Sequence, residues 1–148
     1  MKACIFHDTS NALHDRRVFE IVEEAYNRRA EVLIFAGSKE RAAEIDRILW
    51  IIRQDSFIPH QIVGENEEKI SVPVVIVTEE RNPHRARILI ADGHCSLEFS
   101  SGFDLIHEFV YHSSPGIKEA CRKRYKSYKD GKVPVEYIKT GVWKGQVQ

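Results

Sequence analysis

The stretch EVLIFAGS, residues 31–38, joins an apolar run to the start of a helix. Residues 31–36 have the length and composition of a buried strand, and the glycine after them ends the run. Ser38 is suited to cap a following helix, although Arg41 stands where a full capping box has glutamate. We expect this helix to end at about Ile51. A strand that leads directly into a helix is the unit from which α/β folds are built.

Strands and helices alternate through the rest of the chain as well. A short strand is predicted at residues 3–6, followed by a helix whose buried stripe consists of Val18, Ile21, Val22 and Ala25. Further strands are predicted at residues 72–77, 87–91 and 103–111. A last helix is expected to start at residues 113–115 and to close at Gly131 and Pro134. This alternation predicts an α/β layered fold with a mainly parallel sheet.

The composition is that of one ordinary globular domain, residues 1–148, with 43% hydrophobic and 30% charged residues. In the C-terminal tail, from about residue 135 to 148, Tyr137 and Trp143 stand among polar residues. We expect part of this tail to pack on the body and its end to fray. The chain has no apolar run near the roughly 18 residues of a membrane span and no signal pattern, so we expect a cytoplasmic protein without membrane contact.

The cysteines and histidines favour neither a disulfide framework nor a metal site. Cys4, Cys95 and Cys121 are odd in number, far apart and outside any CxxC pair. The histidines show no ligand spacing such as HExxH. We therefore expect no metal and no cofactor.

A basic run with tyrosines set into it, RKRYKSYK at residues 122–129, stands out because the whole chain is neutral, with 22 basic and 22 acidic residues. In a helix, Arg122, Tyr125, Lys126 and Lys129 would share one face. Because the positive charge is confined to this short run, it suits a small acidic partner with an apolar end better than a long polyanion. The alternative is that the face is simply solvated.

Two aromatic residues, Trp50 and Phe57, are the second notable feature. Trp50 lies about 100° round the predicted helix from Leu49 of the core stripe, so we expect it to be partly exposed. Phe57 follows in a proline-bounded loop, SFIPH at residues 56–60, which can fold back beside the helix end. Exposed rings are common anchors of binding sites, and the alternative is that these rings only cover a sheet edge.

Together these motifs resemble the chi subunit family of bacterial DNA polymerase III. RILW at residues 47–50, SFIPH at 56–60 and GE at 64–65 are similar to its LW…SFxPH…GE signature. Residues 122–129 are similar to its RxRYKxYR helix motif, and the likeness extends to TGVWK at 140–144. The resemblance implies a single Rossmann-like domain of three layers. It also implies a non-catalytic accessory subunit of the clamp-loader assembly, related to DNA-directed DNA polymerase only through membership of the holoenzyme.

The resemblance further implies specific partners. Chi proteins bind the psi subunit on one surface and, on another, the acidic C-terminal tail of single-stranded-DNA-binding protein. That tail ends in a phenylalanine with a free carboxylate, and contact with DNA would be only indirect. Some chi proteins join an iron–sulfur helicase in place of the polymerase, and the sequence does not decide between these assemblies. No psi-contact residues are assigned.

Carried over by position, the residues that would hold the tail are Trp50, Phe57, Val110, Arg122, Tyr125, Lys126 and Lys129. The three rings would cradle the terminal phenylalanine, with Val110 as a further wall. Arg122 and Lys126 would hold the carboxylate and nearby aspartates, and Lys129 stands where the family often has arginine. This assignment requires the helix that carries Trp50 and the basic helix to converge in one pocket. The acidic loop at residues 62–71 and GHC at 93–95 depart from the family pattern.

Two other functional classes remain as alternatives. A nucleotide-binding enzyme is suggested by GSK at residues 37–39, but the upstream glycine of a phosphate loop is missing. A nucleophilic or metal site at His94 and Cys95, near Asp92, is opposed by geometry, because adjacent residues of an extended chain point to opposite faces. Both of these candidates belong to the enzyme class. The second functional class is direct binding of single-stranded nucleic acid, since tyrosines among arginines can stack on bases.

Overall fold

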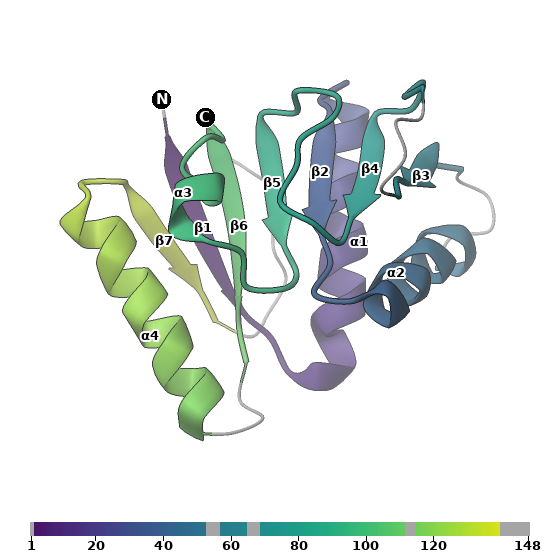
Figure 1. The fold of residues 1–148 in the computed structure, drawn as a ribbon. Helices are drawn as coiled ribbons and strands as arrows, with labels where there is room; N and C mark the ends of the chain where they lie inside the picture. The colour runs from purple at the N-terminus through teal and green to yellow at the C-terminus, as the bar shows by residue number, and fades with distance from the viewer. Residues whose placement is uncertain (1, 53–56, 65–68, 112–114, 140–148) are drawn as a thin grey trace.

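The computed structural model describes residues 2–52, 57–64, 69–111 and 115–139, which form one sheet covered by helices (Figure 1). The strands are β1 (Ala3–Asp8), β2 (Val32–Phe35), β3 (His60–Ile62), β4 (Val74–Val77), β5 (Ile88–Ala91), β6 (Leu105–Val110) and β7 (Val135–Ile138). The helices are α1 (Asn11–Asn27), α2 (Lys39–Ile51), α3 (Leu97–Ser100) and α4 (Pro115–Asp130). The predicted α/β fold is confirmed.

All strand pairs in the described part of the chain are parallel, in the order β3-β4-β2-β5-β6-β1-β7. At the centre, Val32 of β2 pairs with Val74 of β4 on one side and with Ile88 of β5 on the other. The carboxyl ends of all the strands therefore lie at one edge, where open α/β sheets place their binding sites.

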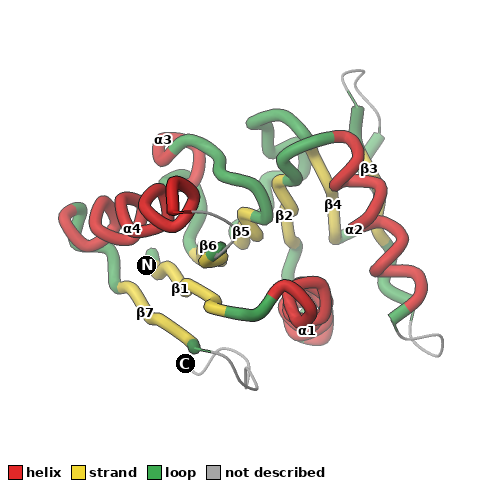
Figure 2. The backbone as a smooth tube through the Cα atoms, turned by 90° about the horizontal axis from the view of Figure 1, so that it is seen from below, coloured by secondary structure: helices red, strands yellow, loops and turns green. Residues whose placement is uncertain are grey.

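Successive side chains of each strand point to opposite faces of the sheet, so the core has two halves, one on each face. Val32 and Ile34 belong to the core that packs under α1 and α2, whereas Leu33 and Phe35 belong to the core on the side of α3 and α4. Figure 2 shows α1 on one side of the sheet and α3 and α4 on the other. Because helices cover both faces, the central strands β2, β4 and β5 are continuously apolar and fully buried. The result is the expected three-layer arrangement.

The predicted signals around β2 and α2 are confirmed in detail. Ser38 caps α2, because the backbone N–H of Arg41 donates a hydrogen bond to its Oγ over 3.0 Å. The helix ends at Ile51, as predicted. The apolar stripe predicted for α1 is also buried: Val18, Ile21, Val22 and Ala25 are at most 1% exposed.

Three elements were not predicted: β3, α3 and β7. β3 has three residues within the stretch that the sequence indicated to be a loop, and α3 is a single turn. β7 arises from the first part of the expected C-terminal tail and pairs with β1 at the edge of the sheet.

Two predicted features lie outside the described residues. These are the serines expected to open α4, residues 113 and 114, and the tail from residue 140, which includes Trp143. Among the described residues, no helix combines the length and apolar character needed to cross a membrane.

Candidate functional site

The two groups of predicted binding residues lie at opposite ends of the sheet. Trp50 and Phe57 accompany α2, which packs on β3 and β4, whereas Arg122 and Tyr125 belong to α4, which packs on β6 and β7. β3 and β7 are the two edges of the sheet, and the two helices cover opposite faces (Figure 1). The expectation that both groups converge in one pocket is therefore wrong. Each group has to be considered as a separate surface.

A cavity of about 490 Å³ lies where α4 passes the carboxyl ends of β1, β6 and β7, and we call it the α4 pocket. Its lining residues are Phe6, Asp8, Val110, Lys118, Cys121, Arg122, Tyr125, Tyr137 and Lys139. Three of the predicted residues are thus brought together: Val110, Arg122 and Tyr125. Lys126 and Lys129 lie on the exposed surface of the same helix.

Aromatic contacts fix the apolar part of the α4 pocket. The half-buried ring of Tyr125 packs edge-on against Phe6, with ring centroids 5.2 Å apart. It also meets the ring of Tyr137 edge-on at 6.3 Å, and Lys129 Nζ lies 5.6 Å from its centroid. Val110 adds an aliphatic wall from the end of β6. These side chains form a rigid apolar surface that a second ring or an aliphatic group can contact.

The charges of the α4 pocket are unevenly placed. Lys118 and Arg122 are one turn apart on α4, and Lys139 follows β7. Arg122 Nη1 lies 3.9 Å from Glu119 Oε2, with the two side chains 70% and 57% exposed, so this contact holds the guanidinium only weakly. On the sheet side, Asp8 accepts a hydrogen bond from the hydroxyl of Tyr137. Burial and this hydrogen bond raise the pKa of Tyr137 to about 12, so its hydroxyl stays protonated at neutral pH.

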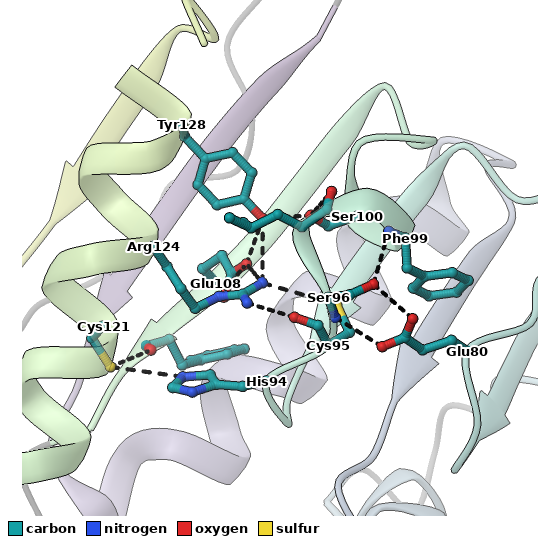
Figure 3. Close-up of polar contacts among 12 residues, drawn as sticks. Glu80, His94, Cys95, Ser96, Phe99, Ser100, Glu108, Cys121, Arg124 and Tyr128 are labelled. Carbon is teal, nitrogen blue, oxygen red and sulfur yellow. Dashed lines mark hydrogen bonds and ion pairs between the residues drawn. The ribbon is translucent and has the colours of Figure 1, made fainter. Parts of the chain in front are cut away.

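The opposite side of α4 holds the helix on the sheet (Figure 3). Arg124 and Tyr128 reach inward to the fully buried carboxylate of Glu108 on β6. Arg124 Nη1 also donates to the backbone oxygen of Cys95, and Tyr128 Oη lies 2.7 Å from Ser100 Oγ. Burial alone would lower the pKa of Arg124, but its hydrogen bonds with Glu108 raise it above the ordinary value. The network thus contains a buried ion pair that positions the outer face of α4.

Trp50 and Phe57 form a second, separate surface, which we call the Trp50 patch. Their ring centroids are 5.0 Å apart, and the two side chains are 52% and 58% exposed, as predicted for Trp50. His60 supports them: its ring meets Trp50 edge-on at 5.1 Å, and its Nδ1 donates to the backbone oxygen of Ile58 over 2.7 Å. Its Nε2 lies 3.1 Å from Asp46 Oδ1. An ordered pair of exposed rings is a typical anchor for a protein partner.

The residues considered for an enzyme have structural contacts instead. His94 Nε2 lies 3.8 Å from Cys121 Sγ on α4. Burial and the nearby charge of Glu108 raise the pKa of Cys95 to about 11, which suppresses the thiolate that a nucleophile needs. Asp92 accepts hydrogen bonds from His14 and Arg41, both over 2.7 Å. Within the described residues, no group of three or more histidine, cysteine, aspartate and glutamate side chains could hold a metal ion.

Sequence reasoning missed several residues of the α4 pocket: Phe6, Asp8, Lys118, Cys121, Tyr137 and Lys139. Lys118 could have been found, because it precedes Arg122 by one helical turn. Phe6 and Asp8 gave no local signal, since their proximity to α4 follows from the position of β1 between β6 and β7. Glu108 and Arg124 were missed as well, although a glutamate within an apolar strand is a recognisable sign of a buried ion pair.

Comparison with known proteins places the chain in a family. Residues 1–136 match the family model described as DNA polymerase III chi subunit, HolC. The chain belongs to the DNA polymerase III chi subunit family. A protein of Escherichia coli (strain K12) named DNA polymerase III subunit chi is 28% identical over 130 residues, which are 88% of this chain and 86% of that protein.

Two further chi proteins are similar to this chain. The DNA polymerase III subunit chi of Pseudomonas aeruginosa is 26% identical over 119 residues, 78% of this chain and 79% of that protein. That of Haemophilus influenzae is 32% identical over 96 residues, 65% and 66% of the two chains. The family match covers all of α4 and every residue that lines the α4 pocket except Tyr137 and Lys139. Both the fold and most of the pocket thus belong to the part shared with other chi subunits.

Proposed function

We propose that this chi-family chain is a non-catalytic accessory subunit that links the clamp-loader assembly of DNA polymerase III to single-stranded-DNA-binding protein. It does so by holding the acidic, phenylalanine-terminated C-terminal tail of that protein in the α4 pocket. The observation that carries the proposal is the pairing of an apolar wall, Phe6, Val110 and Tyr125, with the exposed cation of Arg122 in one cavity.

The apolar wall suits the terminal ring of the tail. A cavity of about 490 Å³ is large enough to take one aromatic side chain together with part of the preceding backbone. Burying the ring stabilises the complex by about 25 cal/mol for each Å² of apolar surface removed from water. Tyr125 is already held in place by Phe6 and Tyr137, so little side-chain entropy is lost on binding.

The cations suit the carboxylates of the tail. The guanidinium of Arg122 can form charge-assisted hydrogen bonds with the terminal carboxylate, and Lys118 lies one turn away. Lys126 and Lys129 extend the positive surface along α4 for aspartates further upstream. Because these charges are exposed, binding should weaken as the salt concentration rises. A short tail also loses conformational freedom, so we expect micromolar affinity, about −8 kcal/mol.

A linking subunit needs a second surface that remains free when the tail is bound. The Trp50 patch meets this need, because it lies at the β3 edge of the sheet while the α4 pocket lies at the β7 edge. We therefore propose that the Trp50 patch contacts the rest of the assembly, either the psi subunit or an iron–sulfur helicase. Trp50→Ala should abolish this contact and leave binding of the tail unchanged.

Direct binding of single-stranded DNA by α4 is the competing function, and the tyrosines argue against it. Tyr128 is only 5% exposed and donates its hydroxyl hydrogen to Glu108. Tyr125 lies in the wall of the α4 pocket, against Phe6 and Tyr137, whereas Tyr128 is buried. The two tyrosines therefore do not form a continuous platform on which successive bases could stack.

Titration distinguishes the two functions. Fluorescence anisotropy would follow the binding of a labelled peptide ending in Asp-Ile-Pro-Phe and, separately, of a labelled single-stranded oligonucleotide. We expect the peptide to bind with micromolar affinity and the oligonucleotide to bind much more weakly at the same salt concentration. A clear preference for the oligonucleotide would overturn the proposal.

A further inference from the structure

We propose that the outer edge of β7 binds the segment that precedes the terminal phenylalanine of the ligand, by adding it to the sheet as one more parallel strand. The ligand is then recognised through its main chain as well as through its terminal ring and carboxylate. The inference rests on the proposed function, because it takes the phenylalanine-ended tail as the ligand of the α4 pocket.

The outer edge of β7 offers backbone groups to a further strand. In the described part of the chain β7 is the last strand of the sheet, and it pairs with β1 along one edge only. Figure 2 shows β7 at one end of the sheet, with α4 over one face. Glu136 and Tyr137 are exposed, and the strand contains no proline that would remove a donor. Such an edge is a template for pairing with another chain.

The pairing with β1 shows which backbone groups of β7 point outward. Cys4 lies opposite Val135 in the register, and its N–H donates to the backbone oxygen of Pro134 over 2.9 Å. In a parallel ladder, a residue bonded in this way is held by the two neighbours of the residue opposite, here Pro134 and Glu136. Val135 itself therefore directs its N–H and C=O groups to the open edge. Two residues further on, Tyr137 does the same.

The α4 pocket sets the direction of the added strand. Tyr137 and Lys139 line the pocket, so it lies at the carboxyl end of β7. Under the proposed function, the free carboxyl end of the ligand occupies this pocket. A segment that reaches the pocket along β7 must therefore run in the same direction as β7. All strand pairs in the described part of the sheet are parallel, so the added strand continues the existing pattern.

The cations of α4 favour an acidic strand at this edge. Figure 1 shows α4 running back beside β7, so Arg122 lies towards the pocket and Lys129 towards the start of the strand. Lys129 Nζ is 5.6 Å from the ring centroid of Tyr125, and that ring packs against Tyr137 of β7. Acidic side chains that face α4 from an added strand approach these cations. A second copy paired through β7 would instead bring two basic helices together, which repel each other.

A peptide that ends in Asp-Ile-Pro-Phe can pair with β7 in only one phase. A proline nitrogen carries no hydrogen, so the proline fits where the backbone points away from the edge. The isoleucine before it then directs its N–H and C=O to β7. The aspartate shares the phase of the proline, and its side chain lies on the same face as Val135 and Tyr137, which is the face of α4. Pairing ends at the proline, and the phenylalanine turns into the pocket.

The first measurement replaces single backbone N–H groups of this peptide by ester oxygens, which removes a donor and leaves every side chain in place. An ester at the isoleucine removes an N–H that faces β7, and we expect about fivefold weaker binding, the size of one hydrogen bond. An ester at the aspartate removes an N–H that faces away from β7. This matched control should weaken binding by less than about twofold. Fluorescence anisotropy with the unmodified protein measures both esters against the all-amide peptide.

The second measurement is amide hydrogen exchange of the protein, followed by NMR. The N–H groups of Val135 and Tyr137 should exchange rapidly in the protein alone and more slowly when the all-amide peptide is bound. The N–H of Cys4 is the internal control, because it is already bonded to Pro134 and should be protected in both states.

Each outcome has a distinct meaning. If the all-amide peptide binds and the two esters weaken binding equally, the added strand is overturned and the proposed function stands. Slow exchange of Val135 and Tyr137 in the protein alone would also overturn the added strand, because a second copy or another part of the chain would then cover the edge. If the all-amide peptide does not bind, the proposed function fails and this inference fails with it.

Discussion

Arg124 Nε donates hydrogen bonds to both carboxylate oxygens of Glu108, each over 3.1 Å. Tyr128, one turn further along α4, donates its hydroxyl hydrogen to the same carboxylate over 2.6 Å. These two residues face the sheet, whereas Arg122 is exposed on the outer side of the helix. The buried ion pair therefore fixes the rotation of α4 about its axis. That rotation brings Arg122 and Tyr125 to the α4 pocket.

Removing the charge of Glu108 should strongly destabilise the protein. Glu108→Gln leaves the guanidinium of Arg124 largely buried without a counter-ion, which we expect to lower the free energy of unfolding by about 3–5 kcal/mol. Asp104→Asn is the matched control, because its partner Arg87 lies 3.4 Å away with both side chains exposed, and it should cost less than about 1 kcal/mol. Urea unfolding measures both, and similar losses in the two variants would contradict the role given to the buried pair.

The buried histidines should make the protein sensitive to mild acid. His7 and His107 lie 2.9 Å apart between Nε2 and Nδ1, and burial lowers their pKa values from 6.5 to about 2 and about 3. The folded protein keeps both rings neutral, while the unfolded chain takes up a proton on each below pH 6.5. Stability is therefore full above that pH and falls as the pH decreases towards 3.

The expected size of this effect follows from linkage. Each histidine contributes about 1.4 kcal/mol for each pH unit, so stability should drop by about 2–3 kcal/mol between about pH 7.5 and about pH 5.5. Urea unfolding at the two pH values measures the drop. In His107→Gln the drop should be about half as large. Stability that stays constant over this range in the unmodified protein would refute the assignment of two neutral buried rings.

The loops after β2 and β5 approach too closely for a side chain at Gly93. A Cβ atom there would lie 2.7 Å from the backbone N and Cα atoms of Gly37. Gly93→Ala should therefore lower the free energy of unfolding by about 1–3 kcal/mol. In Gly116→Ala, at the start of α4, the added atom meets nothing within 4 Å, so stability should be unchanged or slightly higher. Thermal unfolding of the pair tests this, and equal melting temperatures would contradict the close approach.

The fold was predictable where local signals agree. The apolar run before Ser38, the cap itself and the apolar stripe of the following helix all indicated one βα unit, and the structure has it. β3 and β7 were missed because they are short edge strands with exposed residues, so neither a long apolar run nor strict alternation marks them. Their place in the sheet depends on pairing with distant strands, which local patterns do not contain.

The candidate site was predictable only in part for the same reason. Arg122 and Tyr125 were found together because helical spacing is a local property of the sequence. Their separation from Trp50 depends on the strand order, which puts β3 and β7 at opposite edges. Asp8 came to the pocket through the position of β1 beside β7, and nothing near it in the sequence indicated this.

The most direct measurement is the affinity of the acidic, phenylalanine-ended peptide for two variants compared with the unmodified protein. Arg122→Ala removes the guanidinium of the α4 pocket, and Trp50→Ala removes the larger ring of the Trp50 patch at the other edge of the sheet. Both side chains are largely exposed, so both variants should fold. We predict that Arg122→Ala abolishes binding and that Trp50→Ala leaves the affinity unchanged. Loss of binding in Trp50→Ala with normal binding in Arg122→Ala would place the tail on the other edge of the sheet.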